Sequence, residues 1–162
     1  MDAQVKVIGR FERWSSETRP AIDRRRVLVV DDYEDIAESL VAVLELKCFE
    51  ARSAFNGEQA LRLFESWRPH VVILDISLPD VHGIEIGRRM RSLLRHDAAL
   101  IAHTALDASE IRAEAISVGF DAFAGKPISP PELVAIIDLV CPDAREWAKA
   151  RRGWKQAAVA GK

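Results

Sequence analysis

Val71-Val72-Ile73-Leu74-Asp75 decides the fold, because four apolar residues in a row end there at one carboxylate. The chain continues as Ile76-Ser77-Leu78-Pro79-Asp80-Val81-His82-Gly83, in which a proline and a glycine favour a turn. A short apolar run that ends at a turn is typical of a strand buried on both faces of a parallel sheet. Asp75 is therefore predicted at the carboxyl end of this strand, on the edge of an open α/β sheet where ligands bind.

Four further strand-like segments alternate with helical segments along the chain. The predicted strands are residues 27–30, 49–54, 71–74, 99–102 and 120–124, and the predicted helices are residues 36–44, 59–67, 83–94, 108–118 and 131–140. This alternation predicts an α/β fold with a parallel sheet, right-handed crossovers and helices on both faces. In the doubly wound strand order 2-1-3-4-5, the first, third, fourth and fifth strands are neighbours.

The charge of the chain is unevenly distributed. Residues 27–141 carry 10 Lys/Arg and 19 Asp/Glu, whereas residues 1–26 and 142–162 have net charges of +3 and +4. Overall, 49% of the residues are hydrophobic and 30% are charged, as in an ordinary globular protein. An acidic core favours a divalent cation over a nucleic acid as a ligand.

The sequence shows no sign of a membrane span or of secretion. No apolar run approaches the length of about 20 residues that a membrane helix needs, and the first residues lack the features of a signal peptide. Cys48 and Cys141 have no metal-type spacing, which favours two free thiols in a reducing compartment. We therefore expect a cytoplasmic protein.

The length of 162 residues suits one domain with additional residues at both ends. We expect an N-terminal extension, a folded domain and a C-terminal basic amphipathic helical extension, at residues 1–25, 26–141 and 142–162. The N-terminal extension is predicted to be a mobile arm; the alternative is that it docks on the core or on a second copy through Trp14. Trp147 and Trp154 share one helical face, which indicates either packing on the domain itself or contact with a partner or in a homodimer.

Polar residues follow four of the predicted strands, namely Asp31, Asp32, Asp75, Thr104 and Lys126. Because the carboxyl ends of parallel strands lie along one edge, we expect these side chains to converge. Three close carboxylates repel one another, and Mg²⁺ relieves this repulsion while it keeps ligand positions for water and phosphate. We expect Asp32, Asp75 and the backbone carbonyl of Ser77 to bind Mg²⁺. Asp31 is predicted to hold metal-bound water.

The same residues predict a phosphoryl acceptor. A carboxylate such as Asp75 can form an aspartyl-phosphate and needs no general base, because it is already ionised at neutral pH. Lys126 is predicted to supply positive charge to the phosphoryl group. Thr104 is predicted to donate a hydroxyl hydrogen bond to the product phosphate.

These motifs resemble the receiver domain of two-component response regulators over residues 26–141. The resemblance rests on Val27–Asp32 with Asp35, on Asp75–Gly83, on Thr104-Ala105 and on Lys126-Pro127. It implies a flavodoxin-like fold with a five-stranded sheet, as in stand-alone regulators of the chemotaxis type, and a cis bond before Pro127. It also implies an acceptor at Asp75, an acidic pair at Asp31 and Asp32, and a switch formed by Thr104 and Phe123.

The sequence departs from the family pattern at three positions. Leu78 stands where methionine is frequent, His82 where aspartate is frequent, and His103 where the residue is more often apolar. We expect His103 to be a partly buried, hydrogen-bonded histidine rather than a ligand. Because Phe123 has no hydroxyl group, its rotation is predicted to be purely a packing event.

The resemblance implies a role in signal transduction. A histidine kinase or a histidine phosphotransfer protein would phosphorylate Asp75, and Thr104 would then move and vacate space for Phe123. The surface formed by the helix at residues 108–118, the strand at 120–124 and the helix at 131–140 would then change and bind a downstream protein. We expect no direct contact with nucleic acid, because no recognition helix is visible. We also expect no enzymatic activity beyond the protein's own phosphorylation and dephosphorylation.

Three alternatives stay open. A Mg²⁺-dependent phosphatase of the haloacid dehalogenase type also uses an aspartyl-phosphate, but it resembles Asp-x-Asp with a cap insertion, whereas this chain has adjacent Asp31 and Asp32. A receiver-like binding module that never carries phosphate is the second alternative, and the intact Asp75, Thr104 and Lys126 argue against it. The chain could also be a receiver cut from a longer protein.

Overall fold

All five predicted strands lie in one sheet of the computed structural model, which describes residues 6–8, 10–16, 19–93, 97–146 and 148. They are β3 (Arg26–Val30), β4 (Glu50–Ala54), β5 (Val71–Leu74), β6 (Ala99–Thr104) and β7 (Ala122–Gly125). They pair in parallel in the order β4-β3-β5-β6-β7, which confirms the predicted order 2-1-3-4-5. Every residue of the central strand β5 is buried, as its unbroken apolar run predicts.

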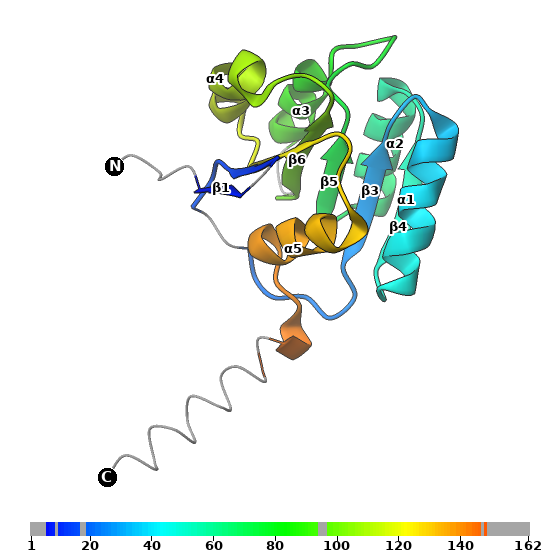
Figure 1. Cartoon of the computed structure of the whole chain (residues 1–162). Helices are drawn as coiled ribbons and strands as arrows, with labels where there is room; N and C mark the ends of the chain where they lie inside the picture. Colours follow the sequence, from blue (N-terminus) through cyan, green and yellow to red (C-terminus); the bar gives the residue numbers. More distant parts are fainter. Residues whose placement is uncertain (1–5, 9, 17–18, 94–96, 147, 149–162) are drawn as a thin grey trace.

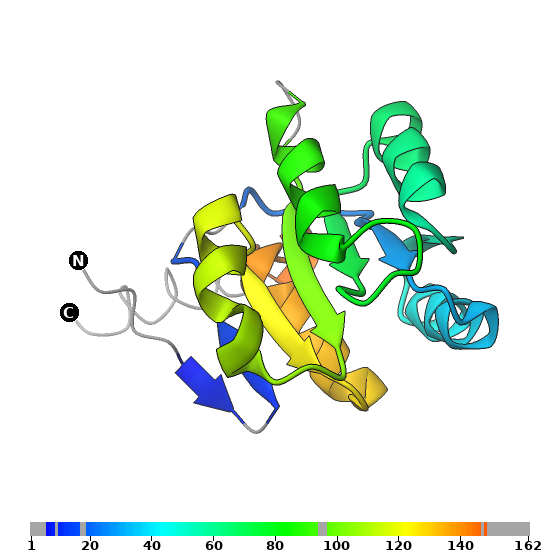
Figure 2. The same ribbon diagram turned by 90° about the horizontal axis from the view of Figure 1, so that it is seen from above.

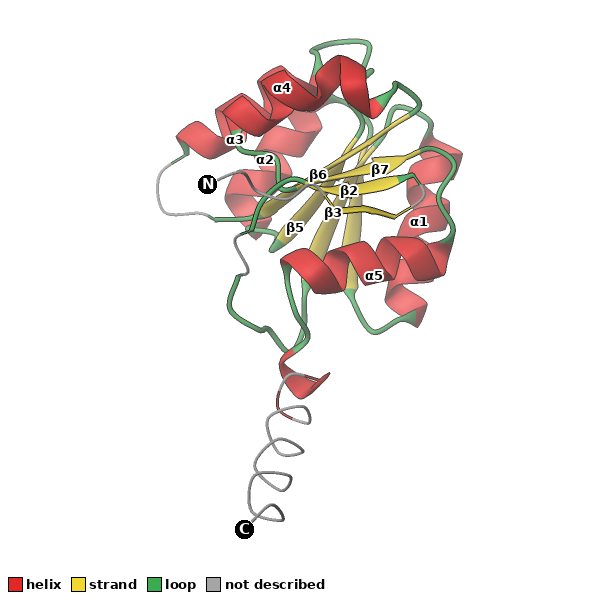
Figure 3. Ribbon diagram, turned by 60° about the vertical axis from the view of Figure 1, so that its left-hand side comes forward, coloured by secondary structure: helices red, strands yellow, loops and turns green. Residues whose placement is uncertain are grey.

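Five helices cover the two faces of this sheet. They are α1 (Glu34–Leu46), α2 (Gly57–Trp67), α3 (Gly83–Ser92), α4 (Ala108–Val118) and α5 (Pro130–Val140). Helices α1 and α5 lie on one face, and α2, α3 and α4 lie on the other (Figures 1 and 3). Successive residues of β5 point to opposite faces, so that Ile73 packs in the buried cluster that includes residues of α1 and α5, and Leu74 packs in the buried cluster that includes residues of α2, α3 and α4.

Side-chain caps fix the starts of three helices. The Asn56 side chain accepts a hydrogen bond from the backbone N–H of Gln59 at the start of α2. Asp107 begins α4 and Ser129 begins α5, each through a capping box with the glutamate three residues later. These caps set where the loops after β4, β6 and β7 end.

The N-terminal residues are part of the sheet, and the prediction of a mobile arm was wrong. Strands β1 (Lys6–Ile8) and β2 (Phe11–Arg13) form an antiparallel pair, and β2 pairs antiparallel with β7. The sheet therefore has seven strands instead of the five predicted, in the order β1-β2-β7-β6-β5-β3-β4. Figure 2 shows the two added strands, in dark blue, at one edge of the molecule.

Burial of two aromatic side chains explains why this segment docks. Phe11 and Trp14 are only 6% and 3% exposed, and each adds a large apolar surface to one of the two buried clusters. Pairing with β2 also satisfies backbone groups of β7 that an open sheet edge would expose. Further along, the Arg19 guanidinium donates a hydrogen bond of 2.9 Å to buried Asp121. The alternative interpretation, docking on the core, is therefore confirmed.

The C-terminal residues are described in part. Helical residues at 144–146 follow Asp143, in agreement with the predicted helix start. Trp147 and Trp154, on which the prediction of a contact face rests, lie outside the described residues. Within the residues that are described, no helix has the length and apolar character needed to cross a membrane.

Candidate functional site

The carboxyl ends of β3 and β5 bring three carboxylates together, as the sequence predicts. Asp31, Asp32 and Asp75 each place one carboxylate oxygen within 4.8 Å of the others. Asp31 and Asp75 are only 1% and 4% exposed, so that two of the three acids lie in the protein interior. Buried like charges repel strongly unless a cation lies between them.

Lys126 provides one such cation from the end of β7. Its amine donates hydrogen bonds to Asp31 and, over 2.8 Å, to Oδ2 of Asp75. Burial would lower the pKa of Lys126, but the hydrogen bonds and charges of the two aspartates outweigh this and raise the pKa above its ordinary value. The lysine is thus held in its charged form between the two buried acids.

One carboxylate oxygen of the cluster has no partner. Oδ1 of Asp32 is buried and, among the described residues, receives no hydrogen bond. A buried carboxylate oxygen without a donor is costly, and a bound cation removes that cost. Three carboxylates of hard oxygen character, one with an unused oxygen, fit a Mg²⁺ ion.

The loop after β5 fixes the orientation of Asp75. The backbone N–H of Ser77 donates a 3.0 Å hydrogen bond to Oδ1 of Asp75. Gly83 lies so close to this turn that a Cβ atom there would come within 2.3 Å of the Asp75 carbonyl oxygen. The Asp80 carboxylate accepts hydrogen bonds of 2.9 and 3.1 Å from the Gly57 N–H, which ties the loop to α2. Ser77 therefore lies beside the acceptor, whereas a role of its carbonyl as a ligand stays a prediction.

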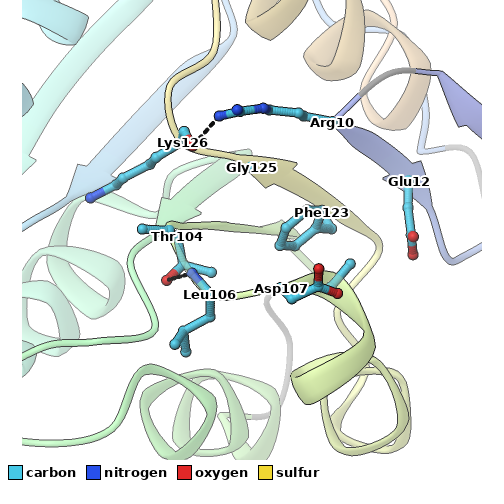
Figure 4. Close-up of a pocket in the computed structure, with 10 residues that line it drawn as sticks. Arg10, Glu12, Thr104, Leu106, Asp107, Phe123, Gly125 and Lys126 are labelled. Atoms are coloured by element: carbon cyan, nitrogen blue, oxygen red, sulfur yellow. Dashed lines mark hydrogen bonds between the residues drawn. The ribbon is translucent and has the colours of Figure 1, made fainter.

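Thr104 lies at the end of β6 and Phe123 lies within the neighbouring strand β7, and both line a pocket of about 410 Å³. Figure 4 shows both side chains at this pocket, together with Arg10 and Glu12 from the N-terminal segment. The Thr104 hydroxyl accepts a long hydrogen bond of 3.4 Å from the Leu106 N–H. In this structure the hydroxyl is thus directed to the loop before α4. The predicted cis bond before Pro127, which follows β7, is confirmed.

His103 is more deeply buried than predicted. It is 4% exposed, and its Nε2 atom has no hydrogen-bond partner among the described residues. Burial, and secondarily the charge of Lys126, lower the pKa of His103 to about 4 against the opposing effect of Asp31 and Asp75. His103 is therefore a neutral histidine beside the acidic cluster.

Sequence reasoning missed Arg10 and Glu12 at the pocket, and it missed the contact of Trp14 with Phe123. The Arg10 guanidinium donates a 2.7 Å hydrogen bond to the carbonyl oxygen of Lys126, and Trp14 stacks on Phe123 (Figure 4 for Arg10 and Lys126). The signal in the sequence was the pair of aromatic residues Phe11 and Trp14 in an otherwise polar segment. Their partners lie more than 100 positions away, and no local pattern points to them.

Comparisons with known proteins agree with this geometry. A model of the response regulator receiver domain matches residues 27–138. The phosphate regulon transcriptional regulatory protein PhoB of Pseudomonas aeruginosa is 35% identical over 117 residues, which is 72% of this chain and 51% of that protein. The response regulator MprA of Mycolicibacterium vanbaalenii is 36% identical over 68% of this chain and 47% of its own length. The chain thus spans about half the length of the curated relatives that it matches.

Solved structures give the same result. A CheY-like receiver domain from Methanospirillum hungatei aligns with a TM-score of 0.68 and 28% identity, over 72% of this chain and 92% of that one. The beryllofluoride-activated receiver domain of DrrB, from Thermotoga maritima, aligns with a TM-score of 0.63 and 28% identity, over 71% of this chain and 95% of that one.

Proposed function

Since the chain belongs to the response regulator receiver domain family, we propose that its phosphoryl acceptor is Asp75 and that Mg²⁺ is its cofactor. Receiver domains serve two-component signal transduction, so a histidine kinase or a histidine phosphotransfer protein is the proposed donor. We propose that the protein acts in the cytoplasm and that its output is contact with another protein rather than with nucleic acid.

One observation carries the proposal. Lys126 donates hydrogen bonds to Asp31 and Asp75 at the strand ends, next to Oδ1 of Asp32, which has no hydrogen-bond partner among the described residues. This arrangement combines a nucleophile, a cation beside it and a buried carboxylate oxygen to which no described residue donates. An ion-pair network with a purely structural role would satisfy all its buried oxygens, and this one does not.

The surroundings of Asp75 orient its carboxylate for attack. The Ser77 N–H holds Oδ1 and the Lys126 amine holds Oδ2, so that both oxygens have fixed directions. In the proposed step, a carboxylate oxygen of Asp75 attacks the phosphorus of a phosphohistidine. The new O–P bond forms as the N–P bond breaks, and the leaving imidazole keeps that electron pair and takes a proton from water.

Charge stabilisation comes from two groups. Asp32 and Asp75, with the Ser77 carbonyl, would hold Mg²⁺, which when bound neutralises negative charge on the phosphoryl oxygens. Lys126 lies within 2.8 Å of Asp75 and can turn to pair with the same oxygens. We propose that Asp31 orients metal-bound water.

Phosphorylation would switch the protein through Thr104 and Phe123. The added charge at Asp75 attracts the Thr104 hydroxyl, which now faces the Leu106 N–H at 3.4 Å. When Thr104 turns away from the pocket, Phe123 gains room there. The surface of α4, β7 and α5 would change as a result and would contact the downstream protein.

The N-terminal strands modify this proposed output surface. Because β2 pairs with β7, the edge of β7 is covered, and a partner would meet α4, α5 and the N-terminal strands together. We propose residues 26–141 as the receiver core, with the N-terminal residues as an added sheet edge and residues 142–162 as a separate extension.

Transfer from a phosphohistidine protein tests the proposed function. The protein is incubated with Mg²⁺ and a phosphorylated histidine phosphotransfer protein, and the label on each protein is followed over time. Transfer to the wild-type chain and none to Asp75→Asn is expected. Label on Asp75→Asn would refute the acceptor assignment, and steady turnover of a phosphate monoester would instead favour the phosphatase alternative.

A further inference from the structure

Trp14 lies directly against the proposed switch residue Phe123. The two rings are stacked with centroids 5.8 Å apart and an angle of 29° between their planes. Trp14 is 3% exposed and Phe123 is 5% exposed, so each ring owes part of its burial to the other. The N-terminal segment thus supplies one wall of the site that holds Phe123.

Glu12 links this tryptophan to α4. Its carboxylate is buried and accepts hydrogen bonds of 2.7 Å from the indole Nε1 of Trp14 and of 2.7 Å from Nε of Arg112. A second nitrogen of Arg112 binds the other carboxylate oxygen, so the ion pair is bidentate. The bond to Arg112 lowers the pKa of Glu12, which keeps the carboxylate charged.

The backbone couples the N-terminal segment to β7 as well. Glu12 lies opposite Phe123 in the register of β2 and β7. The N–H groups of Trp14 and Ser15 both donate to the Asp121 carbonyl oxygen, at 2.8 and 3.0 Å. A displacement of Phe123 in β7 would therefore also move β2, because the two strands are hydrogen bonded to each other.

Phe123 contacts both Trp14 and a pocket. Trp14 stacks on its ring, and Phe123 lines the pocket of about 410 Å³ that Thr104 also lines (Figure 4 for Phe123 and Thr104). The stacked arrangement coexists with a Thr104 hydroxyl directed to Leu106 instead of to Asp75. The stack is therefore present in an arrangement in which the Thr104 hydroxyl faces Leu106.

We propose that Trp14 and Glu12 are positioning residues of the phosphorylation switch. Trp14 holds Phe123 in its unphosphorylated orientation, and Glu12 transmits a movement of Trp14 to Arg112 on α4. Phosphorylation of Asp75 would thus change the position of the N-terminal strands as well as that of α4. This inference rests on the proposed phosphoacceptor function and names a regulatory part that lies outside residues 26–141.

The size of the expected effect follows from the stack. An aromatic pair contributes a free energy that corresponds to a factor of about 2 to 12 in an equilibrium constant beyond the area that it buries. If switching breaks the stack, its removal favours the switched state by up to this factor. Because coupling between sites is reciprocal, the affinity for a phosphoryl mimic at Asp75 rises by the same factor.

The first experiment measures beryllofluoride binding in the presence of Mg²⁺ by fluorine NMR. Trp14→Leu is expected to bind about 2- to 12-fold more tightly than the wild type. Arg112→Gln removes the ion pair between Glu12 and α4 at a side chain that is 37% exposed, so this variant is expected to fold even if the Trp14 variant does not. Its affinity for beryllofluoride is expected to rise as well, by a smaller factor. Arg62→Gln, in an exposed helix pair with Glu58, is the matched control and is expected to bind as the wild type does.

The second measurement follows tryptophan emission during the same titration. A change on beryllofluoride binding is expected in the wild type and in Trp67→Phe, and its loss is expected in Trp14→Phe. If beryllofluoride binds to all variants equally and the emission change does not depend on Trp14, the inference is overturned while the proposed function stands. If beryllofluoride does not bind to the wild type, the proposed function fails and this inference fails with it.

Discussion

Acidification should destabilise the protein through the buried side chain of His103. His103 is 4% exposed, and burial lowers its pKa from 6.5 to about 4. In the unfolded chain the same imidazole titrates near pH 6.5. Between these values the unfolded state binds a proton that the folded state does not, so the free energy of unfolding falls as the pH falls through this window.

The size of this effect can be worked out from the two pKa values. Between pH 7 and pH 5, the difference in protonation lowers the free energy of unfolding by about 2 kcal/mol. The choice of pH 5 keeps most carboxylates ionised, so that the histidine dominates the change. Replacement by leucine fills a similar volume and removes the titration, so His103→Leu should lose about 2 kcal/mol less over this interval.

Urea unfolding at pH 7 and pH 5 measures both quantities. The wild type and His103→Leu are compared without Mg²⁺, and the difference between their two changes isolates His103, because the other three histidines, His70, His82 and His96, are present in both proteins. Equal pH dependence in the two proteins would refute the reasoning. That result would mean that the imidazole is charged or hydrated in the folded state.

Three further predictions concern the same framework. Trp14→Ala should lower the free energy of unfolding in urea by about 3 kcal/mol or more, because a buried indole is lost. A change near zero would favour the interpretation of the N-terminal segment as a mobile arm. Gly83→Ala should either slow phosphorylation by acetyl phosphate or lower the thermal stability, because the new Cβ atom would displace the Asp75 carbonyl. A variant with both the phosphorylation rate and the thermal stability of the wild type would contradict this close approach. Asp121→Ala should destabilise the protein by about 3 kcal/mol, because Arg19 would lose its buried carboxylate partner, although it keeps the pair with exposed Asp97, and Arg91 would lose its ion pair with Asp121. A calorimetric midpoint equal to that of the wild type would show that the ion pairs of Asp121 contribute nothing.

The sequence predicted those parts of the fold in which a few consecutive residues show by their apolar character that they are buried. The apolar run at 71–74 predicts a strand covered on both faces, and in the structure β5 is buried in the interior of the sheet, between β3 and β6. The strand order then predicts that Asp31, Asp75 and Lys126 meet, and their hydrogen bonds confirm the convergence. Topology alone was sufficient for this, because all parallel strands end on the same edge.

The N-terminal strands could not be predicted in the same way. Strand β2 has three residues, Phe11, Glu12 and Arg13, and its two charged residues hide the apolar pattern. Glu12 can be buried because Arg112 neutralises its charge and the Trp14 indole donates a hydrogen bond to its carboxylate. Arg112 lies 100 positions away in the sequence. Long-range pairing of a buried charge leaves no local signal. Likewise, His103 was expected to be partly buried and hydrogen bonded, and the structure buries it with an Nε2 atom that has no partner among the described residues.

Phosphorylation by acetyl phosphate, followed by intact mass, tests the central claim most directly. The claim is that carboxylates from separate strands and Lys126 form one Mg²⁺-dependent acceptor site on Asp75. We predict that the wild type gains one hydroxylamine-labile phosphoryl group when Mg²⁺ is present and none when a chelator removes it, and that Asp75→Asn gains none. Labelling that is independent of Mg²⁺, or that persists in Asp75→Asn, would contradict the account.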